Sequence, residues 1–317
     1  MDELHYDVAV IGAGPAGMTA AMYAARALKR TALFEAKLPG GELLNTELIE
    51  DYPGFESITG AELAQRMADH SLRFGAELLP RRVTAIVPRA DGGHRVEVED
   101  GPPYTADAVI ITAGGEPRKL GVVGEQEYAG RGVSYCAICD GAFFRGEHLA
   151  VVGGGDAALE EAAFLTRYAR QVTIIHRRDQ FRAQPLLIER ARANPKIDFV
   201  MNQVVESVVG DGQRVSGVSL RQVHTQVSSE LSVGGVFVFV GFLPNTQLVV
   251  GHVDHDAQGY YRTDEQMRTS VPGIFAAGDV RAQLTRQITT AVGDATTAAV
   301  AATKYVEEEQ APQAAAG

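Results

Sequence analysis

The chain has 317 residues and a formal net charge of −11; 45% of its residues are hydrophobic, 22% are charged, and two are cysteines. This length favours two domains, and the acidic balance argues against a nucleic-acid partner and against binding to an anionic membrane surface. No apolar run reaches the length of a membrane span. The acidic opening Met1-Asp2-Glu3 is unlike a basic secretory signal, so we expect a cytoplasmic protein.

A dinucleotide-binding pattern stands at the start of the chain. Tyr6–Ile11 is predicted to be a buried strand, Met18–Leu28 a helix and Thr31–Phe34 a second strand that ends at Glu35. Between the first strand and the helix lies the G-x-G-x-x-G turn Gly12-Ala13-Gly14-Pro15-Ala16-Gly17. Such glycines allow a tight turn, close approach of a pyrophosphate and close helix packing, and the acid grips a ribose hydroxyl. The alternative is a glycine-rich turn without a ligand.

Two more glycine-rich loops follow in the first part of the chain. Gly40-Gly41, next to Glu42, would let the backbone run close to a flat ring or a phosphate, although an ordinary surface turn has the same composition. Ala108–Thr112 is predicted to be a buried strand that ends in Ala113-Gly114. The glycine- and glutamate-rich stretch 121–132 is typical of a connection between domains.

The only cysteines form a Cys-x-x-Cys pair, Cys136 and Cys139, followed by Asp140. A loop this short gains little stability from a structural disulfide, and a zinc site needs four ligands that the surrounding sequence does not supply, so we expect no metal. The pattern favours a redox-active dithiol over two incidental core cysteines. A dithiol needs a source of electrons.

The first pattern then repeats. Leu149–Val152 is a predicted strand, Leu159–Tyr168 a helix and Val172–Ile175 a second strand, around the G-x-G-x-x-A turn Gly153-Gly154-Gly155-Asp156-Ala157-Ala158. Where the first repeat has Glu35, the second has His176, and the cations Arg177, Arg178 and Arg182 follow it. Guanidinium groups suit a 2′-phosphate, so the second nucleotide is predicted to be NADPH; the alternative is a solvated basic patch.

The acid-ended first site suits the adenosine of FAD. Near the C-terminus, a short strand leads into Gly278-Asp279, whose carboxylate could bond a ribityl hydroxyl. A helix beginning near Arg286-Gln287-Ile288 could point its N-terminus at the flavin. The first unit is therefore predicted to be split, with the second inserted into it. The acidic, then Ala/Gln/Pro-rich tail 307–317 is expected to fray.

Together, in this order and spacing, these motifs resemble the low-molecular-weight thioredoxin reductase family along essentially the whole chain. The resemblance implies an α/β fold of two Rossmann-like, three-layer ββα domains, with an NADPH domain inserted into an FAD domain. We expect FAD-domain parts at residues 1–116 and 247–317 and the NADPH domain, with the redox disulfide, at 117–246. It further implies a homodimer that passes electrons from NADPH through FAD and the disulfide to thioredoxin or a thioredoxin-like protein.

The resemblance also implies residue roles. Cys139 receives electrons from the flavin, Cys136 attacks the substrate disulfide, and Asp140 is their acid–base partner. Asp51, Ala113 and Gly114 are implied at the FAD and Gly241 at the NADPH. Rotation of the inserted domain about residues 115–118 and 244–247 is expected to alternate nicotinamide and disulfide at the flavin.

Departures from the family pattern leave questions open. The family usually has Gln at Glu42, Asn at Asp51, Thr at Ala113 and His at Phe242, and a carboxylate near an anionic reduced flavin is unfavourable unless it is protonated or turned away. Alternatives to the leading interpretation are a peroxidase-linked disulfide reductase, a dithiol oxidase that uses oxygen, and a dinucleotide-binding redox sensor without turnover.

Overall fold

The computed structural model describes residues 4–46, 48–90 and 92–310, and within these ranges the chain forms two compact units. Unit 1 joins the described residues up to Glu116 with those from Pro244 onward, and unit 2 is the continuous segment Pro117–Leu243. The sequence predicts the second domain boundary at 246/247. The chain passes between the units in two paired strands, β9 (Gly115–Pro117) and β18 (Phe242–Pro244). Unit 2 is thus inserted into unit 1, as predicted.

Unit 1 is built on a sheet of seven strands among the described residues, in the order β5-β2-β1-β8-β7-β6, with β19 also on β8. The strands β5, β2, β1, β8 and β19 are parallel, whereas β6, β7 and β8 pair antiparallel as a meander. The bounds are β1 (Leu4–Ile11), β2 (Thr31–Glu35), β5 (Glu77–Pro80), β6 (Val83–Pro88), β7 (His94–Val98), β8 (Tyr104–Ile111) and β19 (Ile274–Ala276).

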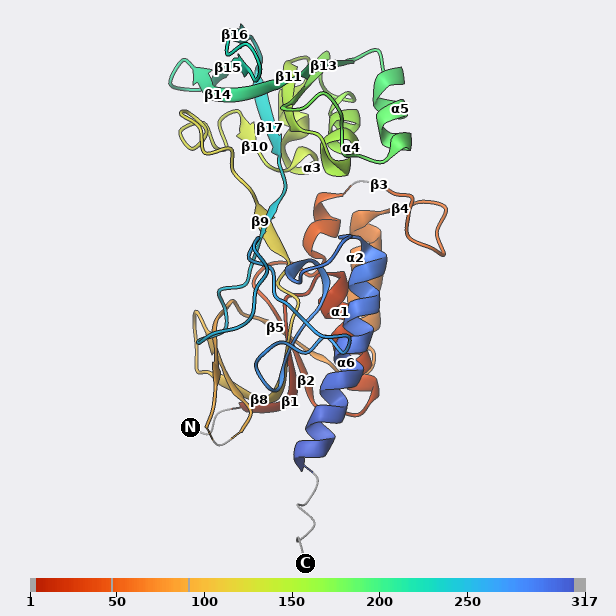
Figure 1. Cartoon of the computed structure of the whole chain (residues 1–317). Coiled ribbons are helices and arrows are strands. Elements are labelled where there is room, and N and C mark those ends of the chain that lie inside the picture. Colours follow the sequence, from red (N-terminus) through yellow and green to blue (C-terminus); the bar gives the residue numbers. More distant parts are fainter. Residues whose placement is uncertain (1–3, 47, 91, 311–317) are drawn as a thin grey trace, which may run out of the picture. The chain divides into compact units, whose positions relative to one another are not determined.

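Three helices contribute to the core on one face of this sheet: α1 (Pro15–Arg26), α2 (Gly60–Leu72) and α6 (Ile288–Gln310). Figure 1 shows α1 and α6 side by side, and buried alanines of both helices belong to one core cluster. Small side chains at helical spacing, such as Ala295, Ala298 and Ala302 of α6, let the helices approach closely. Shorter elements complete the unit: η1 (Gly41–Asn45), β3 (Leu48–Ile49), β4 (Ile58–Thr59) and η3 (Gly278–Val280).

Unit 2 has three layers. Its central parallel sheet has the order β10-β17-β11-β12-β13. On β11, Leu149 and Val151 pack in the cluster that contains the helices, whereas Ala150 and Val152 pack against the antiparallel sheet β14-β15-β16. The bounds are β10 (Val133–Ser134), α3 (Ala137–Asp140), η2 (Gly141–Phe144), β11 (His148–Gly153), α4 (Asp156–Leu165), β12 (Gln171–His176), α5 (Pro185–Ala193), β13 (Ile197–Met201), β14 (Gln203–Gly210), β15 (Val215–Gln222), β16 (Ser228–Leu231) and β17 (Gly235–Phe239). The predicted three-layer ββα arrangement is confirmed.

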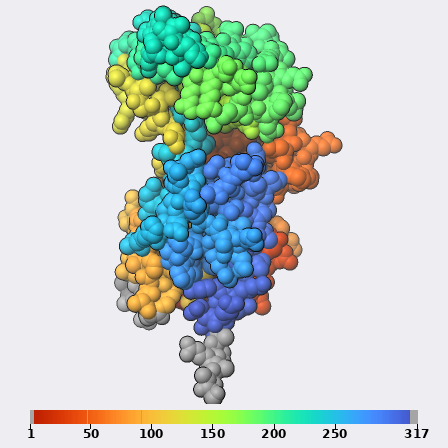
Figure 2. Space-filling model, in the orientation of Figure 1, coloured from red at the N-terminus to blue at the C-terminus, as the bar shows by residue number. Residues whose placement is uncertain are grey.

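Figure 2 shows how the chain is distributed over the surface of unit 1, where N-terminal residues in orange and red lie beside C-terminal residues in blue. The two ends of the chain therefore build one unit. The helix α6 remains regular to Gln310, so the expected fraying does not begin at Glu307; residues 311–317 of the predicted tail lie outside the described ranges.

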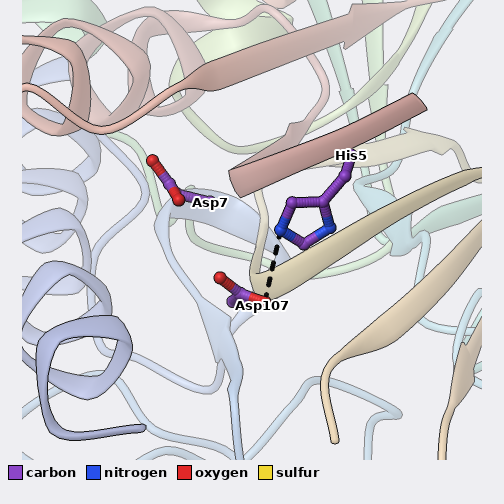
Figure 3. A group of neighbouring side chains, drawn as sticks. All are labelled: His5, Asp7 and Asp107. Carbon is purple, nitrogen blue, oxygen red and sulfur yellow. Dashed lines mark ion pairs between the residues drawn. The ribbon is translucent and has the colours of Figure 1, made fainter. Parts of the chain in front are cut away.

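A polar group at one end of the unit 1 sheet holds the end of α6. His5 and Asp7 lie on β1 and Asp107 on β8, with His5 Nε2 3.4 Å from Asp107 Oδ1 (Figure 3). The Gln310 amide donates to Asp7 Oδ1 at 3.3 Å and to Asp107 Oδ2 at 3.0 Å, and the Arg30 N–H donates to Asp7 Oδ2. Because both carboxylates already have donors, we interpret the group as an anchor for α6 rather than as a metal site.

Candidate functional site

The first glycine turn connects β1 to α1 and leaves space for a ligand at one position only. A Cβ on Gly17 would lie 1.7 Å from the Gly12 carbonyl oxygen, and one on Gly12, where φ is +101°, would lie 2.7 Å from the Thr112 oxygen. A Cβ on Gly14, at the N-cap of α1, would have no heavy atom within 4 Å. Gly12 and Gly17 therefore serve packing, whereas Gly14 faces the open side beside Pro15 and Ala16, where a pyrophosphate can approach the helix N-terminus.

Glu35 lies where the repeat predicts, at the end of β2. Its Oε2 accepts from the Ala13 N–H and its Oε1 from the Lys37 N–H, each at 2.8 Å. The carboxylate is thereby fixed beside the glycine turn. Its remaining lone pairs can accept a ribose hydroxyl, so this part of the unit fits the adenosine end of FAD.

Gly40 and Gly41 lie directly against this turn. The Gly40 N–H donates to the Ala13 carbonyl at 2.8 Å, and a Cβ on Gly41 would lie 3.2 Å from the Gly14 Cα. Both have positive φ, +138° and +54°, which favours glycine. They are therefore more than an ordinary surface turn. Together with the first glycine turn, residues 12–17, they line the open position at Gly14, and we call this surface of unit 1, with the segments that adjoin it, the cradle.

The strand β8 brings Ala113 and Gly114 to the same region. The Ala113 Cα lies 3.1 Å from the Cβ position of Gly12. Asn245 fastens this segment by donating from its side-chain amide to the Ala113 carbonyl and from its backbone N–H to the Gly114 carbonyl. Asp51, in contrast, is exposed in the loop between β3 and β4.

Carboxyl groups from distant parts of unit 1 gather at the C-terminal part of the cradle. The Gly278 Cβ position lies 2.9 Å from the Ala16 Cβ, so the turn that carries Asp279 abuts α1. Burial raises the pKa of Asp279 to about 6; Arg286 lowers it, and Glu42 raises it further. The Glu42 carboxyl is reached by solvent, yet desolvation by the surrounding protein raises its pKa as well. Both shifts move these carboxyls toward protonation, although a pKa of about 6 leaves Asp279 mostly ionised at neutral pH.

Arg286 lies just before α6, which begins at Ile288, with Gln287 between them. The Arg286 guanidinium is placed over the Tyr260 ring, 3.9 Å from its centroid. Stacking of this kind holds the cation in place beside the helix N-terminus.

The second glycine turn, in unit 2, repeats the geometry of the first. A Cβ on Gly153 would lie 2.4 Å from the Phe239 oxygen, and one on Gly154 would lie 2.2 Å from the His176 ring. A Cβ on Gly155, at the N-cap of α4, would again have no heavy atom within 4 Å. Asp156, which precedes Ala157 in the first turn of α4, accepts from the Gln184 N–H at 2.7 Å and so ties α4 to the start of α5.

The residues after β12 divide into a buried wall and an exposed cationic group. His176 is buried against Gly154 and Phe181, and burial lowers its pKa, so it is neutral near pH 7 rather than a cationic donor. Arg177, Arg178 and Arg182 are exposed beyond it, and the charges of the last two contribute to the His176 shift. The positive charge that attracts a phosphate here would therefore come from the arginines and not from His176. Gly241 follows β17 with φ +107°.

The dithiol stands in unit 2, where the edge strand β10 ends and α3 begins. Cys136 and Cys139 form a disulfide; Cys136 is half-buried and Cys139 exposed. The Cys139 N–H donates to Cys136 Sγ at 3.2 Å. A donor directed at this sulfur stabilises its thiolate once the disulfide opens. Asp140 follows, half-buried, with its N–H donating to the Cys136 carbonyl.

Several residues of these sites escaped the sequence analysis. Thr112 Oγ1 donates to the Ile11 and Gly12 carbonyls and so closes the first turn. Arg281 and Asp294, both largely buried, form an ion pair of 3.0 Å, and Asp294 also accepts from the Gly278 N–H. No local spacing signals these pairings.

Comparison with known proteins agrees with this geometry. Residues 6–295 match the family described as pyridine nucleotide-disulphide oxidoreductase. The thioredoxin reductase of Listeria monocytogenes is 51% identical over 97% of this chain and 96% of its own length, and that of Bacillus subtilis is 48% identical over 98% and 97%. The chain belongs to the thioredoxin reductase family.

Solved structures of family members support the assignment. A crystal structure of Lactococcus lactis thioredoxin reductase, described as the FR conformation, matches with a TM-score of 0.93 at 46% identity, covering 96% of this chain and 99% of that one. The thioredoxin reductase of T. acidophilum matches with a TM-score of 0.91 at 38% identity, covering 95% and 99%. Thioredoxin reductases of this family use FAD and NADPH, which are therefore the cofactors of this chain. Among the described helices, none has the length and apolarity to cross a bilayer.

Proposed function

We infer that the chain catalyses the NADPH-dependent reduction of the thioredoxin disulfide through FAD and its own Cys136–Cys139 disulfide. The observation that carries this function is the partly accessible disulfide in the same unit as an arginine-ended dinucleotide turn. The substrate is inferred from the relatives, because this chain is about half identical to thioredoxin reductases over nearly its whole length. A redox sensor without turnover has no comparable support.

The residues that would hold FAD are those of the unit 1 cradle, and the space beside Gly14 and the fixed Glu35 carboxylate fit it. We assign to FAD the cradle residues Gly12, Gly14, Pro15, Ala16, Gly17, Glu35, Gly40, Gly41, Glu42, Ala113, Gly114, Gly278, Asp279, Arg286, Gln287 and Ile288. We also assign to it Asp51, from the exposed loop between β3 and β4. FAD, when bound, relays electrons from the nicotinamide to the disulfide. We assign to NADPH Gly153, Gly155, Asp156, Ala157, His176, Arg177, Arg178, Arg182 and Gly241.

The dithiol performs the exchange with the substrate. The Cys136 thiolate attacks one sulfur of the substrate disulfide and forms a mixed disulfide, and the other substrate sulfur leaves as a thiolate. Cys139 then attacks Cys136, which releases the second substrate sulfur and restores the Cys136–Cys139 disulfide. Two electrons and two protons have passed to the substrate. We propose that Asp140, next to Cys139 in sequence, moves a proton to a leaving sulfur.

The two-strand connection supports a rotation of unit 2 during turnover. The disulfide and the arginine-ended turn both belong to unit 2, whereas the residues assigned to FAD belong to unit 1. A flavin must serve each of them in turn, so we propose that the units rotate about β9 and β18. We further propose a cytoplasmic homodimer, as the family resemblance suggests.

Anaerobic titration with NADPH tests the relay. We expect NADPH to bleach the flavin absorbance of the wild type and of Cys136→Ser, and only the wild type to reduce thioredoxin. NADH is expected to be at least about tenfold less effective, because the arginines gain nothing from a nucleotide without the 2′-phosphate. Equal effectiveness of NADH would overturn the assignment of the arginines, and thioredoxin reduction by Cys136→Ser would overturn the role of Cys136.

A further inference from the structure

Unit 2 contains a buried carboxylate that the mechanism above does not use. Glu125 has an exposed fraction of 3%, although the composition of its stretch, 121–132, is typical of a connection between domains. Charged side chains are rarely buried to this extent unless partners satisfy them. The local sequence does not explain why this carboxylate is buried, but its hydrogen-bond partners do.

Three donors converge on the Glu125 carboxylate from two segments. The Leu120 N–H donates to Oε1 at 2.8 Å and the Gly121 N–H to Oε2 at 2.6 Å. The Tyr135 hydroxyl donates to Oε1 at 2.8 Å. Leu120 and Gly121 belong to the segment that enters unit 2 just after β9, whereas Tyr135 precedes the redox cysteine directly. The carboxylate therefore joins the entering segment to the redox loop.

The Tyr135 hydroxyl keeps the proton that it donates to Glu125. Burial and the hydrogen bond to Glu125 both raise the pKa of Tyr135, so its hydroxyl remains a donor at any physiological pH. On the other side of Cys136 the loop is also fixed, because Ala137 is fully buried in the core cluster beneath α4. Ser134 Oγ, on β10, accepts from the Cys136 N–H at 3.1 Å. The backbone of Cys136 is thus held between two anchored neighbours, one of which depends on Glu125.

We propose that Glu125 is a positioning residue for the redox disulfide. Through its hydrogen bond with Tyr135, Glu125 holds Cys136 where its sulfur meets that of Cys139. The proposal rests on the assignment of Cys136–Cys139 as the redox centre and adds a residue that sets how readily this disulfide closes. Ring closure is an intramolecular reaction, and its equilibrium depends on how often the two thiols are found in the reactive geometry. Loosening the loop lowers this effective concentration.

The consequence is measurable as an equilibrium with dithiothreitol. In the reduction, the S–S bond between Cys136 and Cys139 breaks and one forms within dithiothreitol, while two electrons and two protons pass to the cysteines. We expect Tyr135→Phe, which removes only the hydroxyl, to make the disulfide about tenfold easier to reduce. For a two-electron couple a tenfold change corresponds to about 30 mV.

The experiment equilibrates the full-length, cofactor-containing protein in dithiothreitol buffers of graded redox ratio, traps free thiols by alkylation and counts them by mass. Tyr135→Phe and Glu125→Gln are compared with the wild type and with Glu127→Gln, which removes an exposed charge two residues from Glu125. The unfolding temperature of each oxidised protein is measured in parallel. If Glu125→Gln does not fold, Tyr135→Phe alone decides, because it leaves the Leu120 and Gly121 N–H groups bonded to the Glu125 carboxylate.

An easier reduction of Tyr135→Phe with an unchanged value for Glu127→Gln supports the proposal. If the reduction equilibrium of Tyr135→Phe stays within twofold of the wild-type value, the proposal is overturned, even if the unfolding temperature falls. Glu125 would then be a structural residue only. Thioredoxin reduction by the wild type is assayed separately. Its absence would refute the proposed substrate without altering the measured equilibrium of the disulfide, so the two failures are distinguishable.

Discussion

At the scale of single residues, each glycine turn contains one position that is open and others that serve packing. In unit 1 the Gly17 Cβ position overlaps a backbone oxygen, whereas the Gly14 position is open. A G-x-G-x-x-G motif therefore contains two different requirements, and substitution by alanine separates them.

We expect Gly14→Ala to fold with a stability within about 0.5 kcal/mol of the wild type, because its methyl group meets no protein atom. It should nevertheless lose FAD during purification, because the methyl group occupies the space that a pyrophosphate needs. Gly17→Ala should be destabilised by about 3 kcal/mol or more, since a backbone contact of 1.7 Å cannot be accommodated without a shift of α1. Flavin content and urea unfolding of the apoproteins provide the comparison. Normal flavin content in Gly14→Ala would place the pyrophosphate elsewhere.

Asp279 gives the apoprotein a specific pH dependence. Its pKa is raised from 3.8 to about 6, first by burial, so the folded chain binds more protons than the unfolded chain between these values. The stability contributed by this group is full below about pH 4 and is lost as the pH rises through 6, with a maximum difference of about 3 kcal/mol. Asp279→Asn should remove this dependence and stabilise the apoprotein at pH 8. The difference in unfolding free energy between variant and wild type should therefore grow from pH 4.5 to about pH 6 and then level off up to pH 8. A flat difference over the whole range would contradict the assignment.

At the scale of elements, α6 connects the sheet, α1 and the FAD cradle. Its alanines are buried in the core cluster that includes α1, and the Arg281–Asp294 ion pair and Gln310 hold it at other points. Any shift of α6 moves its first turn, at Ile288, relative to Asp279.

Ala298 tests this connection because its side chain is fully buried. Ala298→Leu should cost about 2 to 3 kcal/mol of stability and weaken FAD binding, since the larger side chain forces α6 outward. The matched control is Val300→Leu, on the exposed side of the same helix, which should change both quantities little. Thermal unfolding and the dissociation constant of FAD measure the effects. Equal behaviour of the two variants would mean that α6 tolerates displacement.

The sequence predicts elements better than it predicts contacts between them. The two βαβ turns, Glu35 and the arginines after β12 could be found because each lies at a fixed distance along the chain from a glycine motif. Glu125, Asn245 and Gln310 could not, because their partners are distant in sequence or unmarked by any spacing. Stretch 121–132 illustrates the limit, since its composition indicates a connection but its folded form buries a carboxylate.

At the scale of the whole molecule, the insertion of unit 2 between two paired strands implies that each unit is separable. Unit 2 has its own core on both faces of its sheet, and unit 1 keeps its sheet and helices without it. Because β9 and β18 are hydrogen-bonded neighbours, the chain leaves unit 1 and returns to it at adjacent points, about 5 Å apart.

A chain that joins Glu116 to Pro244 through a short Gly-Ser linker, without unit 2, should therefore fold and bind FAD. Its flavin should stay oxidised in anaerobic NADPH, because every residue assigned to that nucleotide has been removed, while dithionite still bleaches it. Absorbance spectra before and after each reductant give the result. Bleaching by NADPH would place the nucleotide site in unit 1, and a protein that folds without binding FAD would show that unit 2 contributes to the flavin site. If the shortened chain instead binds FAD that NADPH does not reduce, both the nucleotide site and the disulfide belong to unit 2. Because the flavin belongs to unit 1, turnover then requires the proposed rotation about β9 and β18.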